Sequence, residues 1–95
     1  MIKFLRRRFN AMREQYATER VLYAVDYERE RARLRYPTAH DDIMGTNHLV
    51  NEAVYRLTHM GEFPTNETAR HEFIVAAALL VAAAEVIDRG HSNDG

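Results

Sequence analysis

The sequence FIVAAALLVAAA, residues 73–84, decides the fold of this chain. It is the longest apolar run in the 95 residues, and it contains no glycine, no proline and no charge. A membrane span needs roughly 18 or more apolar residues, so a run this short predicts a helix buried in a protein core. Because the run is apolar on nearly every side, it is typical of a central helix that neighbouring helices surround.

Capping residues bracket this central helix. Thr65 and Asn66 both suit a helix start, and Gly90 stands where a glycine ends a helix in the left-handed conformation. We therefore expect a helix from Thr65 or Asn66 to Arg89, followed by a polar, disordered tail over residues 91–95.

A second helical pattern occupies about residues 2–35 and ends before Pro37, because the residue preceding proline avoids the α region. Apolar side chains recur along one narrow stripe of this helix. The stripe consists of Ile2, Leu5, Phe9, Met12, Tyr16, Tyr23, Tyr27 and Leu34. Glu19, Arg20 and Glu30 interrupt it. Three i,i+3 ion pairs are expected to support its outer half, each by roughly 0.2–0.5 kcal/mol: Asp26/Arg29, Glu28/Arg31 and Glu30/Arg33.

The length of this first helix exceeds the diameter of a compact chain. A helix of 34 residues is about 50 Å long, whereas a compact chain of 95 residues is about 33 Å across. The helix must therefore kink or project. Leu5, Phe9, Met12 and Tyr16 would then need an apolar partner, and a homodimer is the commonest way to supply one.

The middle segment has two possible starts. Thr38, with Asp41 three residues later, resembles a capping box, but Gly45 interrupts the pattern, so the helix could begin only at Thr46 or Asn47. Nothing alternates with a period of two. We predict an all-α fold, a three-helix bundle with a long N-terminal helix and a central Ala/Leu-rich C-terminal helix, in a single domain over residues 1–90.

Charge is unevenly distributed. The net charge is −1, but residues 1–36 carry about +5 and the remainder about −6. The basic patch comprises Lys3, Arg6, Arg7, Arg8 and Arg13. Packing of the first helix on the rest would explain this asymmetry, and so would binding to nucleic acid or a membrane surface. The sequence has no cysteine and no visible secretory signal, which predicts a cytoplasmic protein.

Four carboxylates are candidate Mg²⁺ ligands, because this ion prefers oxygen donors: Asp41, Asp42, Glu52 and Glu72. Each has a structural alternative. Acids at positions 41 and 42 suit a helix start, Glu52 fits a solvated face that it shares with His48, and Glu72 fits the rim of the core.

Three stretches resemble a group of small phage and prophage helical proteins: His40-Asp41-Asp42, the alanine- and leucine-rich residues 76–80, and Glu85-Val86-Ile87-Asp88-Arg89. That group is similar to the MazG-like all-α nucleotide pyrophosphohydrolases, which hold Mg²⁺ between an E-x-x-E and an E-x-x-D on adjacent helices. This chain departs from both motifs. Glu52 has no second acid at the required spacing, and Val75 stands where the second acid after Glu72 would be. Only Glu85-x-x-Asp88 keeps the spacing of the second motif.

Three functions follow as expectations. The first is a non-catalytic phage-type interaction protein without a cofactor, which binds a host or phage macromolecule and inhibits, for example, a defence or regulatory protein. The second is a reduced Mg²⁺-dependent nucleoside triphosphate pyrophosphohydrolase. The third is nucleic-acid or membrane-surface binding through the basic N-terminal helix.

Overall fold

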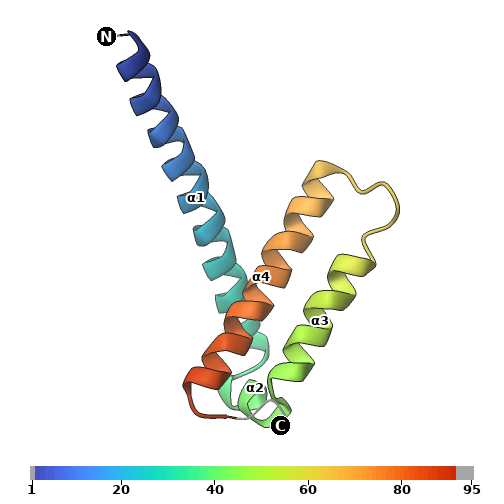
Figure 1. Ribbon diagram of the computed structural model, residues 1–95. Coiled ribbons are helices and arrows are strands. Elements are labelled where there is room, and N and C mark those ends of the chain that lie inside the picture. The colour runs from blue at the N-terminus through green and yellow to red at the C-terminus, as the bar shows by residue number, and fades with distance from the viewer. Residues whose placement is uncertain (1, 92–95) are drawn as a thin grey trace.

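The computed structural model describes the backbone of residues 2–91 and the side chains of residues 6–91. Within that range the chain forms four helices and no strand: α1 (Ile2–Arg35), α2 (Thr38–Met44), α3 (Thr46–Thr58) and α4 (Asn66–Asp88) (Figure 1). The expected all-α class is confirmed. The middle segment forms two helices where the sequence predicted one, because Gly45 adopts a φ of 82° between them.

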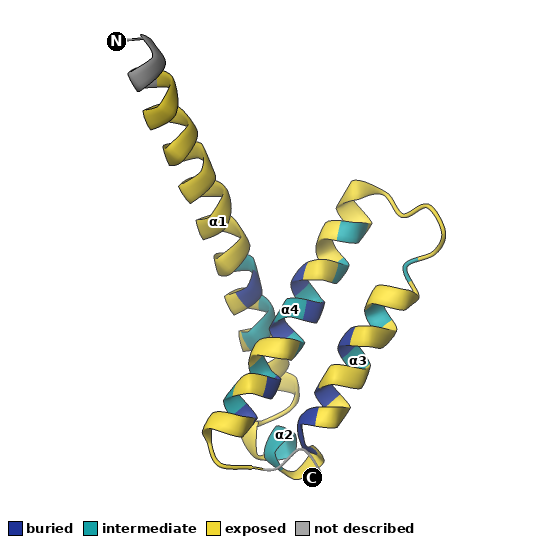
Figure 2. Cartoon of the chain, viewed as in Figure 1, coloured by how far each residue is buried: buried dark blue, intermediate teal, exposed yellow. Residues whose placement is uncertain are grey.

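Helix α4 lies at the centre of the fold, with α3 along one side, the C-terminal half of α1 on the other and α2 near its end (Figure 1). Leu49 of α3 packs against Ala83 and Val86 of α4. Across the α1–α4 contact, Val25 packs against Ile74 and Ala78. The core therefore consists of two small clusters on different sides of α4 (Figure 2).

The expected ends of α4 are confirmed. The Thr65 hydroxyl accepts a hydrogen bond from the Thr68 N–H at 3.1 Å, as a helix-capping residue does. At the other end, Gly90 has a φ of 85°. The His91 N–H donates to the Val86 carbonyl at 3.1 Å, and the Gly90 N–H donates to the Ile87 carbonyl at 2.9 Å. These two bonds form the Schellman motif that a glycine after the last helical turn predicts.

The capping box expected at Thr38 is wrong. Thr38 is already the first helical residue, the capping position is Pro37, and no side chain caps the helix. Pro37 itself has a φ of −55° and a ψ of 154°, so its backbone is still extended and the helix begins with the next residue.

Helix α1 projects from the rest of the molecule (Figure 1). Residues 6–23 are exposed, and Val25 is its one fully buried residue among the described side chains (Figure 2). The radius of gyration is 17.0 Å, against about 12 Å for a compact chain of this length. The accessible surface is 7745 Å², against about 5,700 Å² for a compact protein of this mass.

The described part of the chain includes no helix that is both long and apolar enough to cross a membrane.

Replacing Val86, which is fully buried between α3 and α4, should destabilise the fold. We expect Val86→Ala to lower the free energy of unfolding by about 1–3 kcal/mol, because it leaves a cavity beside Leu49 and Ala83. Urea denaturation followed by circular dichroism measures this change. The neighbouring Ile87 is 54% exposed, so Ile87→Ala should change stability by less than about 0.5 kcal/mol. Equal losses in the two variants would contradict this account of the core.

Candidate functional site

The outer stripe of α1 is a row of large apolar side chains that are more than half exposed to solvent. Its members are 57–90% exposed: Phe9, Met12, Tyr16, Tyr23, Tyr27 and Leu34. An α-helix advances about 100° per residue, so Val25, which packs on α4, points roughly 180° away from Tyr16. The stripe therefore lies on the face of α1 that is turned away from α4. Leu5, also expected on this face, lies outside the described side chains.

The basic arm, residues 6–13, carries four arginines that are exposed. Arg6, Arg7, Arg8 and Arg13 form no ion pair with any acid among the residues that the structure describes. Lys3, the fifth member of the expected basic patch, lies outside the described side chains. The positive charge of the arm is thus directed at solvent, which excludes the interpretation that this segment neutralises the acidic half of the chain.

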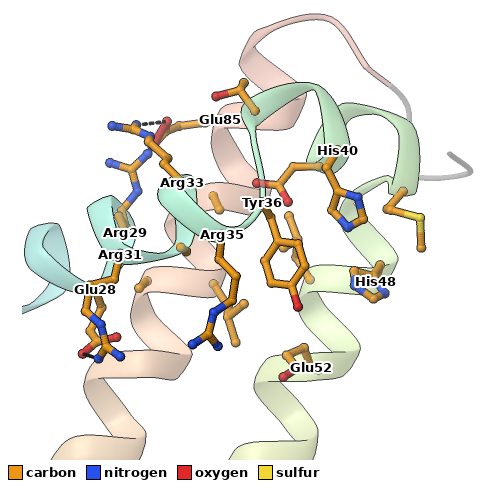
Figure 3. A pocket seen from close by; sticks show the side chains of 18 of the residues that line it. Glu28, Arg29, Arg31, Arg33, Arg35, Tyr36, His40, His48, Glu52 and Glu85 are labelled. Atoms are coloured by element: carbon orange, nitrogen blue, oxygen red, sulfur yellow. Dashed lines mark hydrogen bonds and ion pairs between the residues drawn. The ribbon is translucent and has the colours of Figure 1, made fainter.

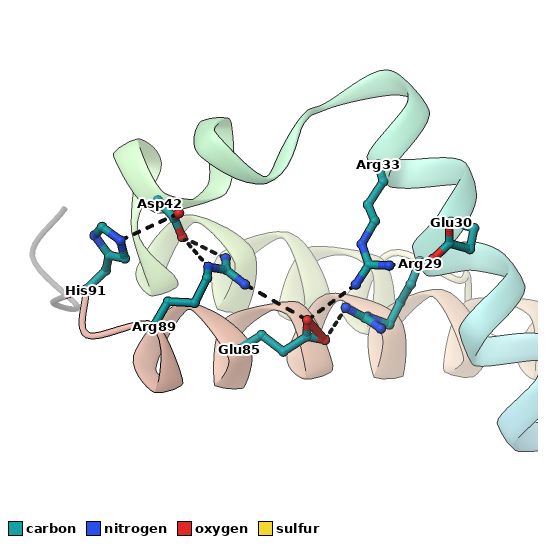
Figure 4. A network of polar contacts seen from close by, with 7 residues as sticks. All are labelled: Arg29, Glu30, Arg33, Asp42, Glu85, Arg89 and His91. Carbon is teal, nitrogen blue, oxygen red and sulfur yellow. Dashed lines mark hydrogen bonds and ion pairs between the residues drawn. The ribbon is translucent and has the colours of Figure 1, made fainter.

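Arginines in the second half of α1 behave differently. Arg29 and Arg33 both reach Glu85 of α4, the second with an N–O distance of 3.5 Å (Figure 4). Glu85 also lies 4.0 Å from Arg89 on its own helix. One carboxylate thereby links α1 to α4 close to the contact made by Val25.

Asp42 fastens α2 to the end of α4. Arg89 donates two hydrogen bonds to its Oδ1 at 2.9 and 2.7 Å, and the His91 ring lies 3.6 Å from its Oδ2 (Figure 4). These Arg89 hydrogen bonds hold the pKa of Asp42 below its ordinary value. The neighbouring Asp41 differs, because burial raises the pKa of its carboxyl group.

Glu52 and Glu72 share one arginine. Arg56 of α3 lies 3.6 Å from Glu52, one turn earlier on the same helix, and 3.4 Å from Glu72 on α4. Pairing with Arg56 explains why a carboxylate near the apolar side of α4 is tolerated, since a half-buried acid is costly unless it is paired.

The four expected Mg²⁺ ligands are therefore dispersed. Asp42 pairs with Arg89, Glu52 and Glu72 pair with Arg56, and Asp41 lies near His40 and His48. Among the described residues no group of three or more histidine, aspartate or glutamate side chains is placed to hold a metal ion. Glu85, whose spacing to Asp88 matches the MazG-like pattern, pairs instead with Arg29 and Arg33 of α1.

A groove of about 470 Å³ lies between α1 and α3 over α4. Apolar side chains of α3 and α4 line it, among them Leu49, Val75 and Leu79. One wall carries an aromatic series: Tyr36 stacks on His40 with ring centroids 5.1 Å apart, and His40 meets the edge of His48 at 6.4 Å (Figure 3). Arg35 borders the groove and pairs with no carboxylate among the described residues.

Sequence reasoning found part of this electrostatic arrangement. The Glu28/Arg31 pair, at 3.2 Å, and the Glu30/Arg33 pair are confirmed. The Asp26/Arg29 pair is wrong, because Arg29 reaches across to Glu85. The role of Glu85 was missed. It could have been inferred from the sequence, because Arg29 and Arg33 lie one turn apart on the same helix face and can pair with one carboxylate on the polar side of α4.

Comparison with known proteins supplies no relative: no protein-family model matches the chain, and no curated protein or solved structure is significantly similar to it.

The Asp42–Arg89 contact predicts a distinctive pH dependence of stability. A carboxyl group whose pKa is lowered by folding stabilises the protein above its unfolded pKa, and that contribution is lost as pH falls through the folded pKa. Asp42→Asn should therefore lower the melting temperature at pH 7, and its difference from wild type should shrink as pH falls below the ordinary value of 3.8. Thermal unfolding between pH 7 and pH 2 measures it.

Asp41→Asn is the matched control, because the pKa of Asp41 is raised rather than lowered. A raised pKa means that the charged form opposes folding at neutral pH, so this variant should be neutral or stabilising at pH 7. A deficit of Asp42→Asn that stays constant down to pH 2 would contradict the assignment.

Proposed function

We propose that this chain is a non-catalytic helical interaction protein, of the phage-encoded kind that its sequence resembles, and that it binds a protein partner of host or phage through the projecting half of α1. The exposed Phe9 and Met12, flanked by the exposed arginines of the basic arm, carry the proposal. Such an arm complements an apolar surface bordered by acidic side chains. The accessible surface of the chain is roughly 2,000 Å² larger than that of a compact monomer of the same mass, and a bound partner would cover part of this excess.

The arginine pairing supports binding over hydrolysis. A Mg²⁺ site built from Asp42, Glu52 and Glu72 would require both Arg56 and Arg89 to be displaced from their carboxylates. Charge-assisted hydrogen bonds of the Asp42–Arg89 type are about twice as strong as neutral ones. The resemblance to MazG-like enzymes therefore supports a helical fold and origin better than it supports their reaction.

Capture of a partner should depend on the apolar residues of the arm. We expect the immobilised chain to retain a specific protein from bacterial lysate, and the Phe9→Ala/Met12→Ala variant to lose at least nine-tenths of it, since both contact side chains are removed. Quantitative mass spectrometry of the retained fraction measures this.

The matched control is Val54→Ala/Leu57→Ala, which removes exposed apolar side chains from α3 and should retain the same protein. Capture that survives loss of Phe9 and Met12 would overturn the proposal. So would release of pyrophosphate from nucleoside triphosphates with Mg²⁺ that is abolished by Glu72→Ala.

A second candidate function is binding of a polyanion, such as nucleic acid or an anionic membrane surface, by the same arm. The observation that favours it is the contrast along α1: Arg29, Arg31 and Arg33 are all paired with carboxylates, whereas the four arginines of the arm pair with no acid in the described part of the chain. Unpaired arginines on an exposed helix release counterions when they meet phosphates, which drives association.

If this candidate is correct, affinity for a DNA duplex should fall steeply with salt. Four phosphate contacts give a slope of log K against log salt of about −3.6, at −0.9 per contact. Neutralising Arg6, Arg7 and Arg8 to Gln should reduce that slope to about −0.9. Fluorescence anisotropy with a labelled duplex measures both. A slope near zero for the unaltered chain would exclude this function.

A further inference from the structure

We propose that a second copy of this chain covers the outer face of α1, and that the two α1 helices pair antiparallel with Tyr23 of each copy opposite the partner's Tyr27. The self-pairing surface, called the seam here, consists of Tyr16, Arg20, Tyr23, Tyr27, Glu30 and Leu34. All six are exposed and lie on the side of the helix opposite the buried Val25.

The spacing of the seam is what a helix pair requires. Its six positions follow one another at intervals of three or four residues, which keeps them on one face along more than five turns. The order of the seam is also symmetric about the level of Val25. Tyr23 and Tyr27 flank that level, Arg20 and Glu30 lie further out at equal distances, and Tyr16 and Leu34 stand at the ends.

This symmetry makes the seam complementary to its own reverse. In an antiparallel pair centred at the level of Val25, Arg20 lies opposite the partner's Glu30, and Tyr16 lies opposite the partner's Leu34. Each apolar position thus faces an apolar one, and each charge faces its opposite. Because an antiparallel pair repeats every contact about a two-fold axis, both charged layers are satisfied at once.

A parallel pair in register has the opposite consequence. It places Arg20 against the partner's Arg20 and Glu30 against the partner's Glu30, so that two layers of like charge are desolvated. Like-charge contacts of this kind act as a penalty that selects orientation in helix pairs. Arg20 and Glu30, two of the three residues that interrupt the stripe, therefore specify the direction and the register of the helix pair.

The three tyrosines of the seam alone supply about half of the area that a standard interface takes from each partner. Three tyrosines of about 200 Å² each, about two-thirds exposed, offer roughly 400 Å² per chain before Leu34 and the charged stems are counted. A standard interface takes about 800 Å² from each partner. The two helices would overlap over residues 16–34, a length of about 28 Å. The accessible surface of the chain exceeds that of a compact monomer by roughly 2,000 Å², which is more than a standard interface takes from one partner.

The rest of the fold leaves room for the second copy. Helix α4 contacts α1 on the Val25 side, and α3 lies beyond α4 (Figure 1). The pair would therefore be layered as α4, α1, the second α1 and the second α4. Residues 6–13 extend past the overlap at each end, so the basic arms stay free and the inference is independent of the proposed function.

Charge reversal tests the seam. The unaltered chain should sediment as a species of twice 11.1 kDa. Arg20→Glu and Glu30→Arg should each weaken dimerisation at least tenfold, and the double variant should restore it, because the opposite charges then face each other again. The matched control is Arg35→Glu, a reversal on α1 away from the seam, which should leave the mass unchanged. Analytical ultracentrifugation over a concentration series measures this.

Cysteine cross-linking tests the register, and the chain has no native cysteine to interfere. Tyr23→Cys/Tyr27→Cys should oxidise to a covalent dimer, whereas Tyr16→Cys alone should not, because its counterpart in the second copy lies about 27 Å along the axis. Non-reducing electrophoresis reports both.

Three results would overturn the inference: a monomer at 100 µM or so, efficient cross-linking of Tyr16→Cys, or failure of the double charge reversal to restore dimerisation. Far-ultraviolet circular dichroism distinguishes these from unfolding, since the seam lies outside the core of the single chain and its variants should keep their helices. A dimer that captures no partner would leave the inference intact while contradicting the proposed function.

Discussion

The close approach that alanine permits around α4 is the constraint on which this structure depends. Ala24 of α1 and Ala77 of α4 both pack against the cluster that contains Ala78, and Ala83 of α4 packs in the cluster that contains Leu49 of α3. Small side chains let helix axes come together, but each buries little apolar surface, so the hydrophobic stabilisation per contact is modest. Four of the eight buried apolar residues are alanines. The larger side chains of the chain are consequently left on its outside, and the long stripe of α1 is the most continuous of these surfaces.

Arginine–carboxylate contacts complement this thin core. Glu85 ties α1 to α4, Asp42 ties α2 to the end of α4, and Arg56 ties Glu72 of α4 to α3. Most of these groups are partly exposed, where an ion pair contributes at most about 1 kcal/mol, so their effect lies in fixing which helix meets which. The arginines of α1 thus differ along the helix. Arg29 and Arg33 join it to α4 through Glu85, whereas those of the basic arm are exposed to solvent.

The sequence predicted the elements better than their contacts. The bounds of α1 and α4 followed from Pro37, Thr65 and Gly90, because each acts on the backbone locally. The sequence left open whether the middle helix starts at Thr38 or only near Thr46, and it did not predict that the residues before Gly45 form a separate helix. The pairing of Arg29 with Glu85, and of Asp42 with Arg89, joins residues about 50 positions apart. Helical periodicity contains no information on how one helix is rotated against another, so the dispersal of the four carboxylates could not be foreseen.

The lack of packing along the N-terminal half of α1 affects how stably this segment stays helical. Over residues 6–23 the side chains of this helix are exposed, and their hydrogen bonds to described residues are local ones, such as that from Gln15 to Glu19 at 3.1 Å. An isolated helix of this length is only marginally stable in water, because nucleation is costly and most helical stability in proteins comes from packing. Its amide protons should therefore exchange far faster than those of α4, and any surface that covers the stripe will slow that exchange. Binding to the stripe and helix formation in this segment are thus linked, because a molecule that covers the stripe also stabilises the helix.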